Sequence, residues 1–333
     1  MGFLLSSGQR RLGAWRAILA LVGLCALIGA KPAFAAHRDC TAAERRAANR
    51  QLWLNERDRD LSIATHLPWG RPSLGPEGSR ERILTQRDYV IHYDGDLRVP
   101  LFTAERVEAA RLGRAHRTDC FRQDERVPAQ EASRPSDYSE PIFDQGHLAA
   151  FANQDRSIIA GNNSFVMTNM VPQTCQFNRG IWQILEGITR LWATRQRVLY
   201  VISGSIFDRD MDGRRDDDSR AARMRANNGT RHVAIPTAFY KIIAYRAPDG
   251  SLETLSILLP HNQENPNRQA AFDYLSRHIT TVADIERRTG LDFFSQSPPL
   301  REANNLWPFD REAAPNSLCH SPPRTDFDPI WTD

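Results

Sequence analysis

Asp144-Gln145-Gly146-His147-Leu148-Ala149-Ala150 is the stretch of this sequence that says most about its fold. It is followed by Thr168-Asn169-Met170-Val171-Pro172-Gln173, and then by Phe177-Asn178-Arg179-Gly180-Ile181-Trp182. A histidine after a glycine is a weak signal by itself, and a buried structural histidine is the alternative. The order and spacing of the three stretches give His147 its context.

The third stretch opens a predicted helix from about residue 180 to residue 193. At about 100° per residue, one apolar stripe forms along it; its members are Ile181, Ile184, Leu185, Ile188, Leu191 and Trp192. One flank of the stripe carries, in order, Asn178, Trp182, Glu186 and Arg190. An ordinary amphipathic helix with a solvated side shows the same spacing, so periodicity alone does not indicate a function.

The three stretches together resemble the signature of the DNA/RNA non-specific endonuclease family. That signature is Asp-Arg-Gly-His, then Ser/Thr-Asn-x-x-Pro-Gln, then Leu/Phe-Asn-x-x-x-Trp leading into a helix with Glu and Arg. The resemblance covers about residues 85–295. It implies an α+β fold of the ββα-metal (His-Me finger) type with a central antiparallel sheet. Two strands and a helix would present His147 and Asn178 to one metal ion.

The resemblance implies a chemical role for each matching residue. His147 resembles the general base that takes a proton from the attacking water, which an imidazole can do near neutral pH. Asn178 resembles the sole direct protein ligand of a Mg²⁺ ion, which keeps most of its waters and for which Mn²⁺ is a substitute. Glu186 resembles a carboxylate that holds the waters of the metal.

Four further residues take supporting roles by the same resemblance. Asn169 resembles a residue that helps to fix the catalytic site. Arg122 and Arg190 resemble arginines that grip the scissile phosphate or its charged transition state. Asp144 would brace the strand of His147, and a turn-capping aspartate is the alternative.

Gln145 departs from the family pattern, which usually has arginine at this position. Glutamine can donate a hydrogen bond to phosphate but brings no charge, and a lost charged contact raises the barrier of the reaction. The sequence therefore predicts a slow enzyme, unless Arg156 or Arg179 supplies the missing charge.

The expected function is hydrolysis of DNA and RNA phosphodiester bonds with little regard for sequence, leaving 5′ phosphates. One alternative is a hydrolase of another phosphodiester. The other is a nucleic-acid-binding protein whose site is weakened by Gln145. A homodimer and a cognate inhibitor protein are further partners that the sequence leaves open.

Residues 1–35 read as a cleavable secretory signal peptide. Arg10, Arg11 and Arg16 precede an apolar run of 14 residues, 17–30, and Ala33-Phe34-Ala35 ends the segment. A transmembrane anchor is the alternative, but the run is shorter than the ~20 residues that a bilayer needs. We therefore expect a secreted or periplasmic protein without a stable membrane anchor after cleavage.

Charge and cysteine content follow from that cleavage. Without its four basic signal residues the chain has 39 basic and 40 acidic side chains, so nucleic acid would need a local basic patch. Cys40, Cys120, Cys175 and Cys319 remain. In an oxidising compartment they predict two disulfides, with three pairings open.

The rest of the chain divides into an N-terminal helical and loop extension (36–84), the endonuclease domain (85–295) and a Pro-rich tail (296–333). Thr41 and Glu44 form a capping box before a predicted helix to about residue 54. Hairpins are predicted at Asp94-Gly95 and Asp249-Gly250, an exposed loop at 122–141, and a helix at 281–289.

Residues 208–218 contain a second motif, Asp208-Arg209-Asp210-Met211-Asp212-Gly213 followed by three aspartates. Its start resembles a calcium loop. Ser219 stands at the twelfth position, where a bidentate glutamate is expected. A solvated acidic loop is therefore favoured over a structural Ca²⁺ site.

Overall fold

A sheet of eight strands organises the part of the chain that the computed structural model describes, residues 38–73, 75, 79–113 and 115–323. The strand order is β13-β12-β11-β8-β4-β3-β2, and all of these neighbours pair antiparallel. One further strand, β14, pairs in parallel with β12. The predicted α+β fold with a central antiparallel sheet is confirmed. The predicted signal peptide lies outside the described residues.

The strands of this sheet have the following bounds: β2 Glu81–Thr85, β3 Val90–Asp94, β4 Val99–Glu108, β8 Val198–Ile206, β11 Ala238–Arg246, β12 Leu252–Pro260, β13 Ile279–Thr280 and β14 Leu300–Glu302. Three two-stranded sheets lie apart from it: β1 (Arg38–Asp39) with β5 (Thr118–Asp119), β6 (Phe143–His147) with β7 (Met170–Thr174), and β9 (Arg223–Arg225) with β10 (Arg231–Ala234).

The helices are α1 Ala42–Leu52, α2 Glu56–His66, α3 Phe151–Gln154, α4 Ile158–Asn163, α5 Gln183–Gln196, α6 Arg268–Arg277 and α7 Val282–Thr289. Short 3₁₀ turns are η1 Ala109–Arg111, η2 Pro135–Asp137, η3 Met167–Asn169 and η5 Asp218–Arg220, and η4 (Phe177–Trp182) is a π-helical segment. Within the described residues, no helix is both long enough and apolar enough to cross a membrane.

Both predicted hairpins form where the Asp-Gly turns stand. β3 pairs with β4 across Asp94-Gly95, and β11 pairs with β12 across Asp249-Gly250. Gly250 has φ +88°, a backbone conformation that residues other than glycine rarely adopt. The turn chemistry of the sequence therefore located two strand pairs of the central sheet.

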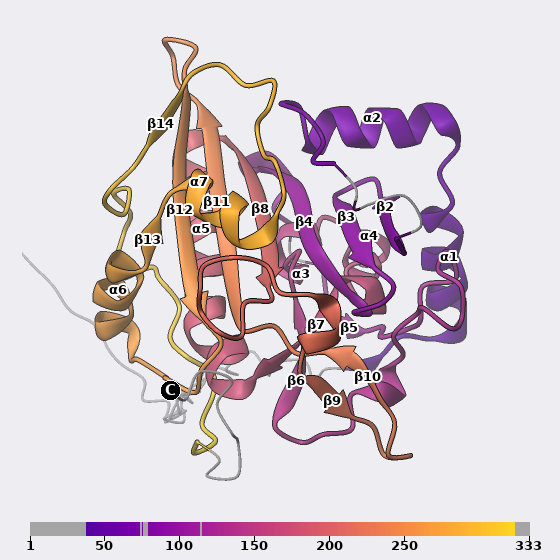
Figure 1. Cartoon of the computed structure of the whole chain (residues 1–333). Coiled ribbons are helices and arrows are strands. Elements are labelled where there is room, and N and C mark those ends of the chain that lie inside the picture. The colour runs from indigo at the N-terminus through magenta and orange to yellow at the C-terminus, as the bar shows by residue number, and fades with distance from the viewer. Residues whose placement is uncertain (1–37, 74, 76–78, 114, 324–333) are drawn as a thin grey trace, which may run out of the picture. The chain divides into compact units, whose positions relative to one another are not determined.

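Two helices cover opposite faces of the sheet. Alternate residues of the strands feed one apolar core, which α5 closes with Ile184 and Ile188, among others. The other alternating set packs against Val282 and Ile285 of α7. Figure 1 shows α7 in front of the sheet. Because strand side chains alternate between faces, the residues of β4, β8 and β11 that face α5 form the floor beneath that helix.

The predicted helix ends are confirmed where capping signals mark them. Thr41 and Glu44 form the capping box of α1. Thr281 caps α7, and Gly290 ends it with φ +70°. Helix α2 was not predicted, although Asn55 caps it, because its apolar pattern is weak: Leu61 is exposed.

The predicted segments before residue 85 and after residue 295 both contribute to the central sheet. The boundary at residue 84 falls inside β2, which pairs with β3. The Pro-rich tail contributes β14, and its Trp307 packs against Trp192 of α5 at 5.6 Å between ring centroids. The tail therefore adds to the main core as well as covering the surface.

The segment 122–141 was predicted as an exposed loop, and its exposure was predicted wrongly. Asp124, Val127 and Ser133 are buried. The buried Asp124 carboxylate is 2.7 Å from the Arg126 guanidinium, and Thr168 donates to it. The polar and charged residues of this segment predicted exposure, but several of them are buried because charged and polar partners compensate them inside the protein.

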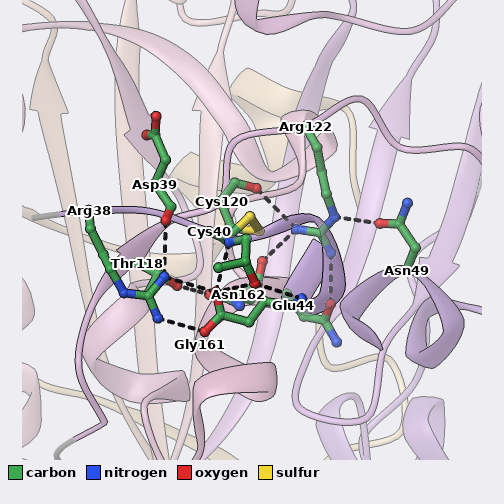
Figure 2. Close-up of a disulfide and its surroundings, with 12 residues drawn as sticks. Arg38, Asp39, Cys40, Glu44, Asn49, Thr118, Cys120, Arg122, Gly161 and Asn162 are labelled. Atoms are coloured by element: carbon green, nitrogen blue, oxygen red, sulfur yellow. Dashed lines mark hydrogen bonds and ion pairs between the residues drawn. A yellow bond between two sulfur atoms is a disulfide. The ribbon is translucent and has the colours of Figure 1, made fainter. Parts of the chain in front are cut away.

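Two disulfides settle the pairing that the sequence left open. Cys40 bonds to Cys120, and Cys175 bonds to Cys319. The first lies beside the β1–β5 pair (Figure 2). It packs against Phe165. The second joins the residue that follows β7 to the C-terminal tail. Each disulfide thus ties a terminal segment to the body of the protein.

We expect the double variant Cys40→Ser/Cys120→Ser to be less stable by about 2–5 kcal/mol, because the bond closes a long loop in the unfolded chain. The bridged cysteines are 80 residues apart in sequence. Urea unfolding followed by circular dichroism measures the difference. The double variant Cys175→Ser/Cys319→Ser tests the second disulfide in the same way. An unchanged midpoint in the first variant would contradict this expectation.

Candidate active site

The β6–β7 hairpin brings two of the three sequence stretches into register. Asp144 pairs with Gln173, and His147 pairs with Met170. Gly146 is required between them, because a Cβ there would lie 2.1 Å from Oε1 of the buried Gln173 side chain. The glycine of the motif therefore has a packing reason.

The third stretch enters its helix through the π-helical segment η4. Gly180 has non-helical backbone angles (φ −104°, ψ −110°), and regular α-helix begins only at Gln183. The predicted regular helix from about residue 180 is therefore wrong in its first turn. Phe177 and Trp182, which lie on either side of this kink, stack at 5.6 Å between ring centroids. Trp182 is buried in the core and does not lie on a solvated flank.

His147 ends β6 and packs among aromatic rings. Its ring meets Phe165 edge-on at 4.7 Å and lies 6.1 Å from Phe121. Its carbonyl accepts a hydrogen bond of 3.1 Å from the Trp182 indole. Burial, and secondarily the positive charge of Arg117, lower the pKa of His147 well below its ordinary value of 6.5. The imidazole is therefore neutral at pH 7, the form that a general base requires.

Asn178 lies on η4 with its carboxamide oriented by β6. Its Nδ2 donates to Asp144 at 2.9 Å. Because an ionised carboxylate only accepts hydrogen bonds, Asp144 must face the NH₂ group of Asn178 and not its oxygen. Arg179 in turn donates two bonds to Asp144, at 2.6 and 2.8 Å. Within the described residues, the Oδ1 of Asn178 accepts no hydrogen bond.

This arrangement fits a hard divalent cation. The carboxamide oxygen is left as a neutral acceptor, and amide and carboxylate oxygens are the protein ligands that Mg²⁺ takes. Asp144 therefore braces the candidate ligand as well as belonging to the strand of His147. The sequence predicted only that Asp144 braces the strand of His147; its hydrogen bond with Asn178 is a contact that the sequence did not show.

Glu186 and Arg190 follow on α5 and are partly buried. Burial raises the pKa of Glu186, and the charges of Lys241, Arg190 and Arg117 act against that rise. Arg190 also donates to Asn153 at 3.5 Å. The Arg117 guanidinium lies 5.0 Å from the ring centre of Phe165, which meets the His147 ring. This arginine therefore lies near the predicted base, and its charge acts on both Glu186 and His147.

Asn169 is fully buried and bonds to the backbone of the residues that follow His147. Its side chain accepts from the Ala149 amide at 2.9 Å and donates to the carbonyls of Ala149 and Ser164 at 3.0 and 2.8 Å. Its own carbonyl accepts from the Leu148 amide. Asn169 thus holds the backbone that follows His147.

Arg122 is placed differently from what the resemblance implies. It is 3% exposed, and its guanidinium donates to Asn49, to the carbonyls of Cys120 and Asn162, and to Asn163 (Figure 2). These bonds join the segment after the first disulfide to α1 and α4. A phosphate contact would require several of them to break.

Gln145 is half-buried on β6, and its amide is 3.4 Å from the carbonyl of Pro135. Of the two arginines considered as substitutes for the missing charge, Arg156 pairs with Asp88 at 2.7 Å. Arg179 pairs with Asp144, the neighbour of Gln145 in the chain. Only Arg179 of these two is joined to the strand that carries His147.

The acidic loop brings its first three aspartates together. One carboxylate oxygen from each of Asp208, Asp210 and Asp212 lies within 4.8 Å of the others. Arginines already pair with two of them, Arg288 with Asp208 at 2.9 Å and Arg220 with Asp210 at 2.8 Å. These ion pairs fit the favoured interpretation of an acidic loop, while the convergence fits the first ligands of a calcium loop.

Two residues at the site were missed from the sequence. Arg117 precedes the second cysteine of a disulfide and has no motif around it. Lys241 lies in an apolar strand, where burial of an ammonium group is rare. The one feature of the sequence that distinguishes Lys241 is that it is a lysine in a chain whose only other lysine is Lys31.

The sequence pattern of the DNA/RNA non-specific endonuclease family matches residues 73–300, a range wider at both ends than the predicted 85–295. Mitochondrial endonuclease G of Homo sapiens is 32% identical over 227 residues, covering 68% of this chain and 71% of the relative. Mitochondrial nuclease EXOG of Danio rerio is 29% identical, covering 74% and 70%.

Two further similarities come from a longer protein and a solved structure. A venom phosphodiesterase of Macrovipera lebetinus is 29% identical over 78% of this chain, which spans only 32% of that relative. The crystal structure of an EndoG/EndoGI complex, described as showing the mechanism of EndoG inhibition, matches with a TM-score of 0.56 at 26% identity. That match covers 73% of this chain and 96% of the solved one.

We expect the imidazole of His147 to stay neutral at pH values well below 6.5, its ordinary pKa. Arg117→Ala removes a nearby positive charge, so it should raise the pKa of His147 toward that ordinary value. NMR titration of isotope-labelled histidine measures both. Arg301→Ala, an exposed arginine paired with Asp249, is the control. A pKa of His147 that is ordinary, or unmoved by Arg117→Ala, would contradict this account.

Proposed function

Because the chain belongs to the DNA/RNA non-specific endonuclease family, we propose that it is an exported, metal-dependent nuclease that cleaves both DNA and RNA. It hydrolyses phosphodiester bonds with little regard for sequence and leaves 5′ phosphates. His147 is the general base, and Asn178 is the protein ligand of the metal ion. The observation that carries the proposal is the Asp144–Asn178 hydrogen bond, which leaves the carboxamide oxygen as the free acceptor.

His147 removes the proton from the attacking water. Its lowered pKa, caused first by burial, keeps the imidazole unprotonated at neutral pH. The hydrogen bond from Trp182 to its carbonyl fixes the end of the strand. Asn169 fixes the two residues that follow. A general base held in one position contributes more to the rate than a mobile one, because no ordering is needed in the transition state.

Asn178 and Glu186 would hold Mg²⁺, the first directly and the second through the metal's waters; Mn²⁺ is expected to substitute. When bound, the ion polarises the phosphoryl oxygen and stabilises the departing 3′ oxygen. Asp144 orients Asn178 toward it. Burial raises the pKa of Glu186, and the charges of Lys241, Arg190 and Arg117 oppose that rise; their opposition favours the carboxylate form needed to accept hydrogen bonds from water.

Arg117 and Arg190 are our candidates for the phosphate contact. Both act electrostatically on Glu186, and the Arg117 side chain is partly exposed. We assign the phosphate contact to Arg117 in place of Arg122, which the resemblance implied. The donors of the buried Arg122 guanidinium already form hydrogen bonds inside the protein.

Export remains part of the proposal. It is supported by the signal-like sequence of residues 1–35 and by the two disulfides, which persist in oxidising compartments. The mature protein would be secreted or periplasmic. An inhibitor protein and a homodimer also remain proposals; the solved complex of EndoG with EndoGI supports the first of them.

We expect the purified protein to nick plasmid DNA and to degrade RNA with Mg²⁺ or Mn²⁺, and EDTA to abolish both activities. His147→Ala and Asn178→Ala should each lose at least about 100-fold in rate, because they remove the base and the metal ligand. His278→Ala and Asn305→Ala are matched controls away from the ββα unit.

The same assay separates the alternatives. A small bis-aryl phosphate, cleaved as well as polymer, would favour a hydrolase of another phosphodiester. Binding of DNA without cleavage in either metal would indicate a binding protein. Full activity of His147→Ala or in EDTA would refute the proposed mechanism.

Gln145→Arg should raise kcat on plasmid DNA by about tenfold, because the new charge faces the phosphate in the transition state. Gln51→Arg on the exposed side of α1 adds the same charge elsewhere. Steady-state kinetics of the two variants isolates the effect of position. An unchanged or lower kcat for Gln145→Arg would mean that the site is already built around glutamine.

A further inference from the structure

Lys241 is the only lysine among the described residues, since Lys31 lies outside them. It stands on the central strand β11 and is 1% exposed. Its ammonium donates to the hydroxyl of Ser203 on β8 and lies 4.3 Å from the ring centre of Trp182. A buried ammonium is destabilising unless opposite charge and hydrogen bonds compensate it. The surroundings of Lys241 therefore require an explanation.

Lys241 belongs to a polar row on an otherwise apolar face of the sheet. In register across β4, β8 and β11 lie Thr103, Ser203 and Lys241. The neighbours of Lys241 two positions away on β11, Phe239 and Ile243, belong to the core that α5 closes. Because strand side chains alternate, Lys241 points to this same face, beneath the helix that carries Glu186.

Two carboxylates share the field of this ammonium. Glu186 stands one helical turn beyond Trp182 on α5. Glu105 stands two positions from Thr103 on the same face of β4. The charge of Lys241 acts on both. Glu105 on β4 is 1% exposed and accepts from Asn153 at 2.8 Å and from Gln154 at 2.7 Å. Burial raises the pKa of Glu105 to about 7, although Lys241 opposes the rise and Glu186 adds to it. Lys241 thus acts on both carboxylates, which repel each other, whereas Arg190 and Arg117 act on Glu186.

The same ammonium reaches His147 through one side chain. Lys241 lies against the Trp182 ring, a favourable placement for a desolvated cation. The indole of Trp182 donates to the His147 carbonyl at 3.1 Å. By holding the plane of the Trp182 indole, Lys241 also holds its hydrogen bond to the His147 carbonyl. One buried charge therefore acts on both His147 and Glu186 of the candidate active site.

We propose that Lys241 is a positioning residue of the nuclease site, whose buried ammonium holds the Glu186 carboxylate in place and braces Trp182 beneath His147. This inference rests on the proposed function. Lys241 touches neither substrate nor metal; it acts through Glu186 and Trp182. Glu105 completes the unit by sharing the charge of the lysine.

The chemistry of the site explains why a chain so rich in arginine keeps a lysine here. The ammonium is compact and directs three donors from one atom, whereas guanidinium is a planar fork with five. The space between the Trp182 ring and Ser203 holds a single charged nitrogen. We therefore expect Lys241→Arg to disturb Trp182 even though it retains the charge.

The test is Mn²⁺ binding without substrate, measured by electron paramagnetic resonance, together with kcat and KM on plasmid DNA. Lys241→Met keeps much of the volume and removes the charge. It should weaken Mn²⁺ binding about 10- to 100-fold and lower kcat with little change in KM, since Lys241 does not touch DNA. Circular dichroism shows whether the variant is folded.

A rescue variant separates charge from packing. In Lys241→Met/Glu105→Gln the second buried carboxylate is removed with the lysine, so much of the lost Mn²⁺ affinity should return. Glu105→Gln alone should bind Mn²⁺ as well as the wild type or more tightly, and this variant tests the inference if Lys241→Met does not fold.

Unchanged Mn²⁺ affinity in folded Lys241→Met, no recovery in the double variant, or weaker binding in Glu105→Gln would overturn the role of Lys241 while leaving the proposed function in place. A wild-type protein that binds no Mn²⁺ would instead overturn the metal site of the proposed function, and this inference with it.

Discussion

The hydrogen bond from the Trp182 indole to the His147 carbonyl joins the two halves of the candidate active site. It links β6 to the start of the helical segment across 35 residues of sequence. A second bond, from Asn178 to Asp144, joins the same two elements. Together they place a neutral imidazole and an oriented carboxamide on one ββα unit. The chemistry we propose depends on this unit keeping its geometry, because the base and the metal ligand come from different elements.

The rest of the protein holds that unit from several sides. The core beneath α5 supports the helix from the sheet, and the buried Lys241 adds its charge to those of Arg190 and Arg117 around Glu186. The two disulfides act at the edges. Cys175 lies three residues before Asn178, and the Cys40–Cys120 bond packs on Phe165, which meets the His147 ring. Terminal segments are therefore part of the support of the site.

Local signals in the sequence predicted much of this structure. The Asp-Gly turns located the hairpins, and the caps Thr41 and Thr281 located helix starts. The motif brought attention to His147, Asn178 and Glu186 through its resemblance to a family. What the sequence did not show depends on tertiary contacts. The kink at Gly180 lies between Phe177 and Trp182, which stack within the core, and the partners of Arg122 come from α1 and α4. Neither arrangement leaves a periodic pattern.

Buried charge was the hardest feature to predict, because a hydropathy pattern assigns charged residues to the surface. Lys241, Glu105 and the interior of segment 122–141 all depart from that rule, because other polar or charged groups compensate them inside the protein. The central claim is that His147 and Asn178 serve one divalent cation. Crystals grown with Mn²⁺ test it most directly through anomalous scattering. The account predicts a peak within bonding distance of the Asn178 carboxamide oxygen, on the side of β6 that carries His147. A peak only at the acidic loop of Asp208, Asp210 and Asp212, with none at Asn178, would contradict it.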